Sequence, residues 1–384
     1  MATAFDAIVI GLGAHGSAAA LALARRGARV LGLEVGERGH ELGSSGGRSR
    51  MIRRAYFEDS AYLPLLEAAW AGWDTLGAAA GETFVEVTGG LYGGPADSEV
   101  FRGSVSSAQI QGLPHDVLNA DEIRRRWPVF TVGDEMGALY DPDAGMIRPE
   151  RAIAAQLRLA EQDDAELRFR ERVVDWRPAS NGGFEVETDL GVYGADYLVI
   201  AAGAWTGSFV PDLRLPLEVE RVPVFWFEPK VPVVEVSIGR LPIWILDTAA
   251  DGSFYGFPYD EQAGLKVARH HSGEVVDPAT VDRTERAADV ERVRAFSRSS
   301  FPAADGPLLG SLVCLYTNTP DLGFVIDRHP TVTGVAFASA CSGHGFKFAP
   351  VIGEALADLA TRGTTALPIE PFRAARFAGQ TTAE

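Results

Sequence analysis

The first 34 residues carry the pattern that most constrains the fold of this chain. An apolar segment at 5–10 is predicted to be a strand, and the Ala/Leu-rich segment 17–27 is predicted to be a helix that ends on a glycine. A glycine-rich turn at 11–16 joins the two, and a second predicted strand at 28–34 follows. Strand, glycine-rich turn, helix and strand in this order predict a βαβ unit with parallel strands.

The turn has the spacing of a dinucleotide-binding loop, Gly11-x-Gly13-x-x-Gly16. The first glycine permits the tight turn, the second lets a pyrophosphate approach the backbone, and the third lets helix and strand pack closely. The free N–H groups at the helix N-terminus favour an anion. Glu34 ends the second strand and could accept hydrogen bonds from an adenosine ribose, which disfavours NADP. FAD and NAD remain alternatives, as does a glycine-rich turn without a ligand.

Composition limits the kinds of partner. The chain has 384 residues, enough for about two domains. Its formal net charge of −17 argues against binding to nucleic acid or to an acidic membrane surface. Two cysteines exclude a disulfide framework and a cysteine-rich metal site, and we expect no metal. No signal-peptide pattern and no apolar run of ~20 residues is present, so we expect a cytoplasmic protein.

Alternating helices and strands predict an α/β fold in which the chain leaves a doubly wound, Rossmann-like domain and re-enters it. We expect the dinucleotide-binding domain to comprise 1–80, 149–216 and 321–384. A discontinuous, mostly antiparallel substrate domain is expected from 81–148 and 217–320. Beyond the first unit, the main expected helices are 60–76, 120–127, 150–163, 281–301 and 348–360, and the main expected strands are 184–188, 197–202, 244–246, 254–257, 265–268 and 335–340.

Five further regions carry distinctive residue combinations. They are residues 43–56 (GSSGGRSRMIRRAY), 254–258 with 264–266 (FYGFP and GLK), 313–320 (VCLYTNTP), 324–330 (FVIDRHP) and 342–347 (SGHGFK). In this order they resemble the family of monomeric sarcosine oxidase and N-methyltryptophan oxidase, within the D-amino-acid-oxidase superfamily of FAD-dependent oxidoreductases. The resemblance spans nearly the whole chain and is far more specific than the glycine motif.

This resemblance implies an FAD-dependent oxidase of secondary (N-methyl) amino acids. A hydride equivalent would pass to flavin N5, the resulting imine would hydrolyse to an amine and an aldehyde, and O2 would be reduced to H2O2. The family likeness also favours a monomer. The alternatives are an FAD-dependent amino-acid dehydrogenase that uses another acceptor, and a non-catalytic FAD-binding subunit of an amine-oxidising complex. An NAD-dependent dehydrogenase is disfavoured, because Cys314 would then have no purpose.

The resemblance also implies the residues that contact FAD. Cys314 matches the cysteine whose sulfur is bonded covalently to the 8α-methyl group, a reaction that needs a thiolate. The alternative is a buried apolar cysteine. Cys341 lacks such a context and is expected to be structural. The other cofactor-binding residues are Ser44, Ser49, Arg50, Gly343, His344, Gly345 and Lys347, together with Gly11, Gly13, Gly16 and Glu34.

Six residues match the family's substrate-binding and redox positions. Arg53 and Lys347 would bind the substrate carboxylate, since a guanidinium recognises it in bidentate fashion and an ammonium adds a point charge. Lys266 would promote the reaction with O2, because a fixed cation stabilises superoxide. The remaining three are His270, beside the substrate amine, and the wall residues Tyr255 and Tyr316.

Some positions leave the substrate open. A lone histidine is more often structural, and a slip of one residue would exchange His270 with His271. Arg269 stands where family members often have Tyr, and would favour an acidic substrate side chain if it pointed inward. Leu246 stands where the sarcosine enzyme has Met. The substrate side chain and the oxidised carbon therefore stay undetermined.

Overall fold

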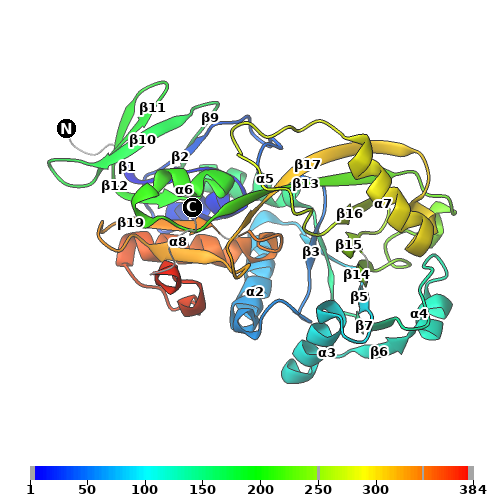
Figure 1. The fold of residues 1–384 in the computed structure, drawn as a ribbon. Helices are drawn as coiled ribbons and strands as arrows, with labels where there is room; N and C mark the ends of the chain where they lie inside the picture. Colours follow the sequence, from blue (N-terminus) through cyan, green and yellow to red (C-terminus); the bar gives the residue numbers. More distant parts are fainter. Residues whose placement is uncertain (1–4, 249–250, 340, 379–384) are drawn as a thin grey trace.

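Two eight-stranded sheets and a three-stranded sheet form the framework of the protein. The computed structural model describes residues 5–248, 251–339 and 341–378. The first sheet has the order β10-β11-β12-β1-β2-β9, with β19 beside β12 and β18 beside β19, and lies at one end of the molecule (Figure 1). Its strands are β1 (Phe5–Ile10), β2 (Val30–Glu34), β9 (Glu166–Phe169), β10 (Val173–Pro178), β11 (Phe184–Thr188), β12 (Val192–Ile200), β18 (Val325–Arg328) and β19 (Val335–Ser339).

The predicted βαβ unit is confirmed within this sheet. β1 pairs in parallel with both β2 and β12, and α1 (Ala14–Arg25) connects β1 to β2. The helix begins at Ala14, earlier than predicted, and Gly27 follows its end with a φ of +80°. α5 (Pro149–Gln162) and α8 (Ala349–Arg362) pack against α1. Residue 340, at the end of the predicted strand 335–340, lies outside the described residues.

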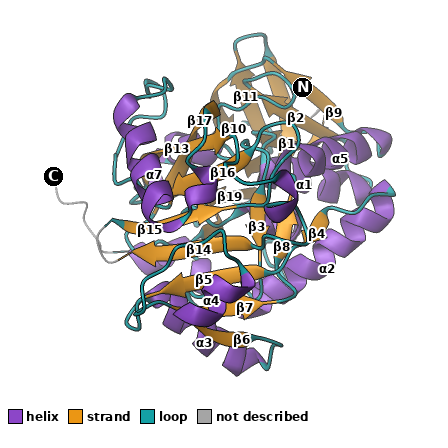
Figure 2. Ribbon diagram, turned by 90° about the vertical axis from the view of Figure 1, so that its right-hand side faces the viewer, coloured by secondary structure: helices purple, strands orange, loops and turns teal. Residues whose placement is uncertain are grey.

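The second sheet is antiparallel except where β14 pairs with β5. Its order is β17-β13-β16-β15-β14-β5-β7-β6, and Figure 2 shows β14, β5, β7 and β6 in succession. The strands are β5 (Gly90–Gly94), β6 (Asp116–Asn119), β7 (Gly137–Asp141), β13 (Glu218–Phe227), β14 (Ile243–Thr248), β15 (Gly252–Gly256), β16 (Leu265–Arg269) and β17 (Leu308–Asn318). The small sheet contains β3 (Arg50–Ile52), β8 (Gly145–Ile147) and β4 (Val85–Val87).

Five further α-helices belong to the described part of the chain. They are α2 (Leu63–Ala80), α3 (Glu99–Gln111), α4 (Ala120–Arg126), α6 (Thr206–Phe209) and α7 (Ala287–Ser300). The expected start of α7 at residue 281 is wrong, because the Asp282 carboxylate accepts the backbone N–H of Thr284 at 2.9 Å. Such local bonds compete with helix formation. Within the described part of the chain, no helix is long and apolar enough to cross a lipid bilayer.

The long strands β13 and β17 bring distant segments together. Their antiparallel register places Glu220 opposite Tyr316 and Val222 opposite Cys314. On its other edge β13 pairs with β16, which places Trp226 opposite Lys266. Residues that are about 40 to 100 positions apart in sequence therefore meet on neighbouring strands beside the candidate site.

Candidate cofactor and substrate site

A cavity of about 740 Å³ collects residues from both large sheets and from the loops beside them. Its wall includes most of the predicted site residues, whereas Gly16 and Lys266 are not part of the wall. The predicted residues that line it are Gly11, Gly13, Glu34, Ser44, Ser49, Arg50, Arg53, Tyr255, His270, Cys314, Tyr316, Gly343, His344, Gly345 and Lys347.

The glycine-rich turn forms one end of this wall. A Cβ at Gly16 would lie 1.7 Å from the carbonyl oxygen of Gly11, so only glycine lets the helix approach the turn this closely. The N–H of Ala14 donates to Oγ of Ser45 at 3.2 Å, which brings the 43–53 segment to the start of α1. A helix N-terminus beside a cavity is suited to an anionic ligand.

Glu34 is a buried carboxylate at the end of β2. It accepts hydrogen bonds from the N–H groups of Leu12 at 2.8 Å and Gly36 at 3.2 Å, and Nε2 of His40 lies 3.0 Å from it. Burial opposes its charge, but the His40 and Leu12 contacts outweigh that effect and lower the pKa of Glu34. The wall therefore carries a fixed negative charge that can accept hydrogen bonds from a ligand.

Arg50 and Cys314 lie next to each other in the cavity wall. Nη2 of Arg50 lies 3.6 Å from Sγ of Cys314, and the carbonyl oxygen of Ser44 also lies 3.6 Å from the sulfur. Nη2 of Arg50 additionally donates to the carbonyl oxygens of Ser44 and Gly46, which orients the guanidinium. The guanidinium therefore places a hydrogen-bond donor and a positive charge beside the sulfur.

Arg53 and Lys347 form a cationic pair at another part of the cavity. Both side chains are buried, with 2% and 4% of the residue surface exposed. Nη2 of Arg53 donates to both carboxylate oxygens of Glu58 at 2.5 and 2.7 Å. Burial opposes ionisation of Glu58, but the charges of Arg53, His344 and Lys347 lower its pKa to about 2. Nζ of Lys347 donates to the carbonyl oxygen of His344 at 2.7 Å, and burial together with the Arg53 charge lowers the pKa of Lys347 to about 7.

His270, Tyr316 and Tyr255 form a neutral polar cluster in the wall. Nδ1 of His270 lies 3.4 Å from Oη of Tyr316, which also hydrogen-bonds Tyr255. Burial and the neighbouring His271 lower the pKa of His270 to about 3, and burial raises the pKa of Tyr255 to about 12. A Cβ at Gly343 would lie 2.6 Å from the Tyr316 ring and 2.7 Å from Cε1 of His270. The glycine is therefore needed for these rings to reach the cavity.

Lys266 lies behind the 43–53 segment. Its Nζ donates to the carbonyl oxygens of Gly47 at 2.7 Å and Ser49 at 3.1 Å, and the side chain is 2% exposed. Burial and the charge of Arg50 lower the pKa of Lys266 well below its usual value. Lys266 thus touches the loop that forms the wall but does not itself line the cavity.

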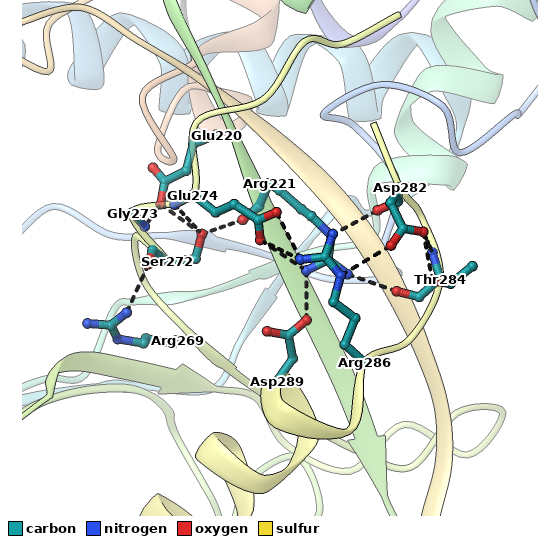
Figure 3. A network of polar contacts seen from close by, with 10 residues as sticks. All are labelled: Glu220, Arg221, Arg269, Ser272, Gly273, Glu274, Asp282, Thr284, Arg286 and Asp289. Carbon is teal, nitrogen blue, oxygen red and sulfur yellow. Dashed lines mark hydrogen bonds and ion pairs between the residues drawn. The ribbon is translucent and has the colours of Figure 1, made fainter. Parts of the chain in front are cut away.

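The turn after β16 determines which of the two adjacent histidines faces the cavity. His270 lines it, whereas His271 does not. The buried Glu220 carboxylate accepts the N–H of Gly273 at 2.7 Å and the hydroxyl of Ser272 at 3.2 Å (Figure 3). Nδ1 of His271 lies 2.9 Å from the same carboxylate, which Nδ2 of Asn318 contacts at 2.8 Å. These contacts fix the turn to β13 and β17.

The rest of this segment is fixed by the next residue of β13. Arg221 is fully buried, donates to Oδ2 of Asp289 at 2.7 Å and bonds the backbone carbonyl oxygens of Asp282 and Thr284 at 2.8 Å (Figure 3). Between the two anchors, Arg283 lines the cavity and donates to the carbonyl oxygens of Leu42 and Val313. Glu220 therefore fixes residues 271–273 and Arg221 fixes residues 282–289. The segment that these contacts hold, 271–289, forms part of the cavity wall.

Comparison with known proteins decides the family. Residues 6–359 match the family model described as FAD dependent oxidoreductase. The chain belongs to this family. A monomeric sarcosine oxidase from Streptomyces avermitilis is 42% identical over 381 residues, which cover 98% of this chain and 99% of that protein. An N-methyl-L-tryptophan oxidase from Salmonella enteritidis PT4 is 35% identical and covers 97% of this chain and 99% of that protein. The resemblance inferred from the sequence is thus confirmed.

Solved structures of amino acid oxidases share the fold of this chain. The open form of NikD, an amino acid oxidase essential for nikkomycin biosynthesis, has a TM-score of 0.87 at 25% identity and covers 96% of this chain and 97% of that one. Glycine oxidase from Geobacillus kaustophilus has a TM-score of 0.80 at 23% identity, covers 97% of this chain and 98% of that one, and shows the shared fold alone. The predicted α/β fold with a Rossmann-like domain is confirmed.

The cavity wall fits FAD. Among the residues that the structure describes, three buried hydroxyl groups of the wall have no hydrogen-bond partner: Oγ of Ser44, Oγ1 of Thr317 and Oγ of Ser339. Buried polar atoms rarely stay unpaired, so these groups are suited to the polar edges of a bound molecule. The helix N-terminus at Ala14 suits its pyrophosphate and Glu34 its ribose.

Three residues differ in place from what the sequence suggested. Arg269 does not line the cavity: Nε donates to the carbonyl oxygen of Asp251 at 2.8 Å and Nη1 to that of Ser272 at 3.1 Å. The condition for an acidic substrate side chain is therefore not met. Leu246 is also buried away from the wall, and its neighbour Ile245 lines it instead. Cys341, expected to be structural, does line the cavity.

Sequence reasoning missed several wall residues. Glu58 follows the recognised 43–56 segment by only two positions, but nothing in its immediate sequence marks it as a partner of Arg53. Arg283 was hidden in a segment predicted to be helical. The apolar side chains were not distinguishable from ordinary core residues; those lining the cavity include Met51, Phe57, Val224, Ile245 and Phe257.

Proposed function

We propose that this protein is an FAD-dependent oxidase of secondary (N-methyl) amino acids that uses O2 as its acceptor. The observation that carries the proposal is the buried cationic pair of Arg53 and Lys347 in the wall of a cavity that fits FAD. Buried charges are paired in proteins; Glu58 supplies one negative charge to these two cations, and a substrate carboxylate would supply the second. The names of the relatives, sarcosine oxidase and N-methyl-L-tryptophan oxidase, support this class of substrate.

In this proposal Arg53 binds the carboxylate through two N–H groups and Lys347 adds a third donor. Glu58 now takes the Arg53 donors, so the substrate carboxylate must share them or displace Glu58. His270 is neutral above its pKa of about 3. It can therefore form a hydrogen bond with the substrate amine without placing a positive charge beside it. The amine itself enters the reaction deprotonated.

Bound FAD would supply the two-electron oxidation of the substrate and the transfer of those electrons to O2. The residues proposed to hold it are Gly11, Gly13, Gly16, Glu34, Ser44, Ser49, Arg50, Cys314, Gly343, His344, Gly345 and Lys347. The buried Lys266, which touches the wall loop at Gly47 and Ser49, is proposed to stabilise negative charge that develops when O2 is reduced. Tyr255 and Tyr316 are proposed to shape the wall beside the substrate.

We further propose that Cys314 forms a thioether with the 8α carbon of FAD. The new C–S bond replaces the S–H bond of Cys314 and one C–H bond of the methyl group. FAD would supply the two-electron oxidation that this bond requires, and O2 would be the final acceptor of the two electrons and two protons. Nη2 of Arg50, 3.6 Å from the sulfur, places a positive charge beside the group that would form this bond.

We also propose the division into two domains that the sequence predicts. All described strands of the first eight-stranded sheet fall within 1–80, 149–216 and 321–384, and those of the second within 81–148 and 217–320. The small sheet contains strands from both parts. A monomer is proposed because the sarcosine oxidases among the relatives are named monomeric.

The test is made on the purified protein. Denaturation in acid followed by centrifugation separates bound from free flavin, and yellow colour in the pellet that is lost in Cys314→Ala supports the thioether. H2O2 release is then measured with sarcosine and a panel of N-methyl amino acids. Fast substrate-dependent H2O2 supports the oxidase. Reduction of an artificial dye without H2O2 would instead indicate a dehydrogenase, and no turnover at all would indicate a non-catalytic subunit.

A further inference from the structure

A buried tyrosine contacts both cations of the proposed carboxylate clamp, Arg53 and Lys347. Tyr56 is 1% exposed and is not part of the cavity wall. The centroid of its ring lies 4.6 Å from Cζ of Arg53 and 5.0 Å from Nζ of Lys347. The electron-rich face of an aromatic ring attracts cations, most strongly where water is excluded. A single ring therefore contacts both positive charges of the clamp.

The hydroxyl of Tyr56 reaches the clamp by a second route. Oη lies 2.6 Å from Nδ1 of His344, and Nε2 of His344 lies 3.2 Å from the carbonyl oxygen of Leu322. A carbonyl oxygen only accepts, so Nε2 carries the proton and Nδ1 accepts the O–H of Tyr56. Burial lowers the pKa of His344 to about 3 and raises that of Tyr56 well above 10, so this arrangement persists at ordinary pH. The carbonyl oxygen of His344 accepts Nζ of Lys347 at 2.7 Å.

We propose that Tyr56 is a positioning residue of the carboxylate clamp. Its ring keeps Arg53 and Lys347 charged and in place, and its hydroxyl fixes His344, whose carbonyl orients Lys347. The inference rests on the proposed function, because it requires these two cations to bind a substrate carboxylate. A residue outside the cavity wall thus determines how strongly the cavity binds an anion.

Tyr62 provides a matched control. It packs in the same aromatic cluster, with its ring centroid 5.3 Å from those of both Tyr56 and His344. Its hydroxyl also makes a buried hydrogen bond, accepting the N–H of Phe324 at 3.1 Å. Among the described contacts, however, its ring faces neither Arg53 nor Lys347. Removing this hydroxyl should therefore cost stability without changing the clamp.

The experiment compares FAD-loaded wild type with Tyr56→Phe, Tyr56→Leu and Tyr62→Phe. Each is titrated with propanoate and with propanamide, a neutral molecule of the same size, while the flavin absorbance reports binding. We expect Tyr56→Phe to weaken propanoate binding about 3- to 10-fold and Tyr56→Leu about 10- to 100-fold, with propanamide unchanged. For sarcosine, KM should rise more than kcat falls. Tyr62→Phe should keep the wild-type affinities while lowering Tm about as much as Tyr56→Phe.

Two results would overturn the proposal. If Tyr56→Phe and Tyr62→Phe bind propanoate equally well, Tyr56 is an ordinary core residue. An equal loss of propanoate and propanamide binding would indicate a general collapse of the site rather than a loss of charge recognition. If Tyr56→Leu fails to fold, Tyr56→Phe alone decides. If the wild type binds propanoate no better than propanamide, the proposed function itself is contradicted. Failure of the Tyr56 proposal and failure of the proposed function therefore give different results.

Discussion

Nδ1 of His271 lies 2.9 Å from Oε2 of Glu220, on the side of the turn away from the cavity. His271 has a φ of +58°, a left-handed conformation that is uncommon for a residue with a side chain. The buried Glu220 carboxylate stabilises it, and the same turn directs His270 into the cavity wall. The contact between His271 and Glu220 therefore decides which of two adjacent histidines is available to the substrate.

Glu220→Gln tests this relationship. The variant loses the charge that His271, Ser272, Gly273 and Asn318 contact, and we expect unfolding to require about 2 to 4 kcal/mol less free energy. We also expect a lower kcat/KM, because His270 is no longer held against Tyr316. Denaturant unfolding and steady-state kinetics measure both. The exposed Glu218 on the same strand gives the control, since Glu218→Gln should change neither; equal behaviour of the two variants would contradict the anchor.

The same carboxylate predicts a pH dependence of stability. Burial raises its pKa, but the contacts with His271 and Gly273 lower it to about 2 in the folded protein, from an ordinary 4.5. A depressed pKa means that the folded state is stabilised above pH 4.5 and loses this contribution as pH falls toward 2. Glu220→Gln should therefore flatten the decline in Tm of the wild type below pH 4.5. An unchanged slope would show that other carboxylates account for acid unfolding.

The first βαβ unit was predictable because local sequence determines it. The spacing of Gly11 and Gly16 is imposed by contacts within a few residues, as the 1.7 Å approach at Gly16 shows. α7 was misplaced at its start, since the bond from Thr284 to Asp282 competes with a helix that composition alone favours. α3 was missed because its residues lack a clear apolar stripe; its start is marked only by Ser98, whose side chain accepts the N–H of Phe101.

The site itself was only partly predictable, for a different reason. Arg53 and Lys347 could be named from recognised segments. Glu58 lies close to Arg53 in sequence, but its contact with Arg53 depends on how this loop folds, and the contact of the Tyr56 ring with Lys347 depends on packing between segments that are far apart in sequence. The sequence also could not show whether His270 or His271 faces the cavity, because the residue that decides this, Glu220, lies on another strand. Contacts across strands leave no periodic signal in a single sequence.

Glu58→Gln should separate the stability of the clamp from its affinity for anions. Without Glu58 the buried Arg53 and Lys347 repel each other, so we expect a loss of about 3 to 5 kcal/mol in the free energy of unfolding. Propanoate should then bind more tightly than in the wild type at pH 6, because Glu58 no longer competes for Arg53. Melting temperatures with and without propanoate measure both effects. Glu67→Gln, which breaks the exposed 3.1 Å pair with Arg54, should do neither; weaker propanoate binding in Glu58→Gln would contradict competition.

The pKa of Lys347 predicts how anion binding responds to pH. Burial and Arg53 lower this pKa to about 7, whereas Glu58 raises it. Lysine is charged below its pKa, so propanoate should bind well at pH 6 and progressively less well as pH rises above about 7. The loss should approach at most about tenfold per pH unit, and Arg53 limits it. Lys347→Arg keeps its charge throughout and should show no such step. Wild-type affinity that is constant from pH 6 to 9 would exclude Lys347 as the titrating group.

Lys266→Met tests the proposed role in the reaction with O2. The variant keeps a long apolar side chain against Phe257 and Trp226 but removes the amino group that contacts Gly47 and Ser49. We expect anaerobic reduction of the flavin by substrate to stay within about threefold, while reoxidation by O2 slows by about 100-fold or more, the size of effect seen when one charge-stabilising group is removed. Stopped-flow absorbance measures the two steps separately.

The control for this variant is Lys230→Met, since Lys230 is exposed and pairs with Asp305 at 2.7 Å. Its two rates should equal those of the wild type. Equal slowing of reduction and reoxidation in Lys266→Met would indicate that the loop at 47–49 has moved and that Lys266 only supports the cavity wall. Selective slowing of reoxidation is expected only if the charge of Lys266 acts on O2, because loss of a structural contact would change both steps.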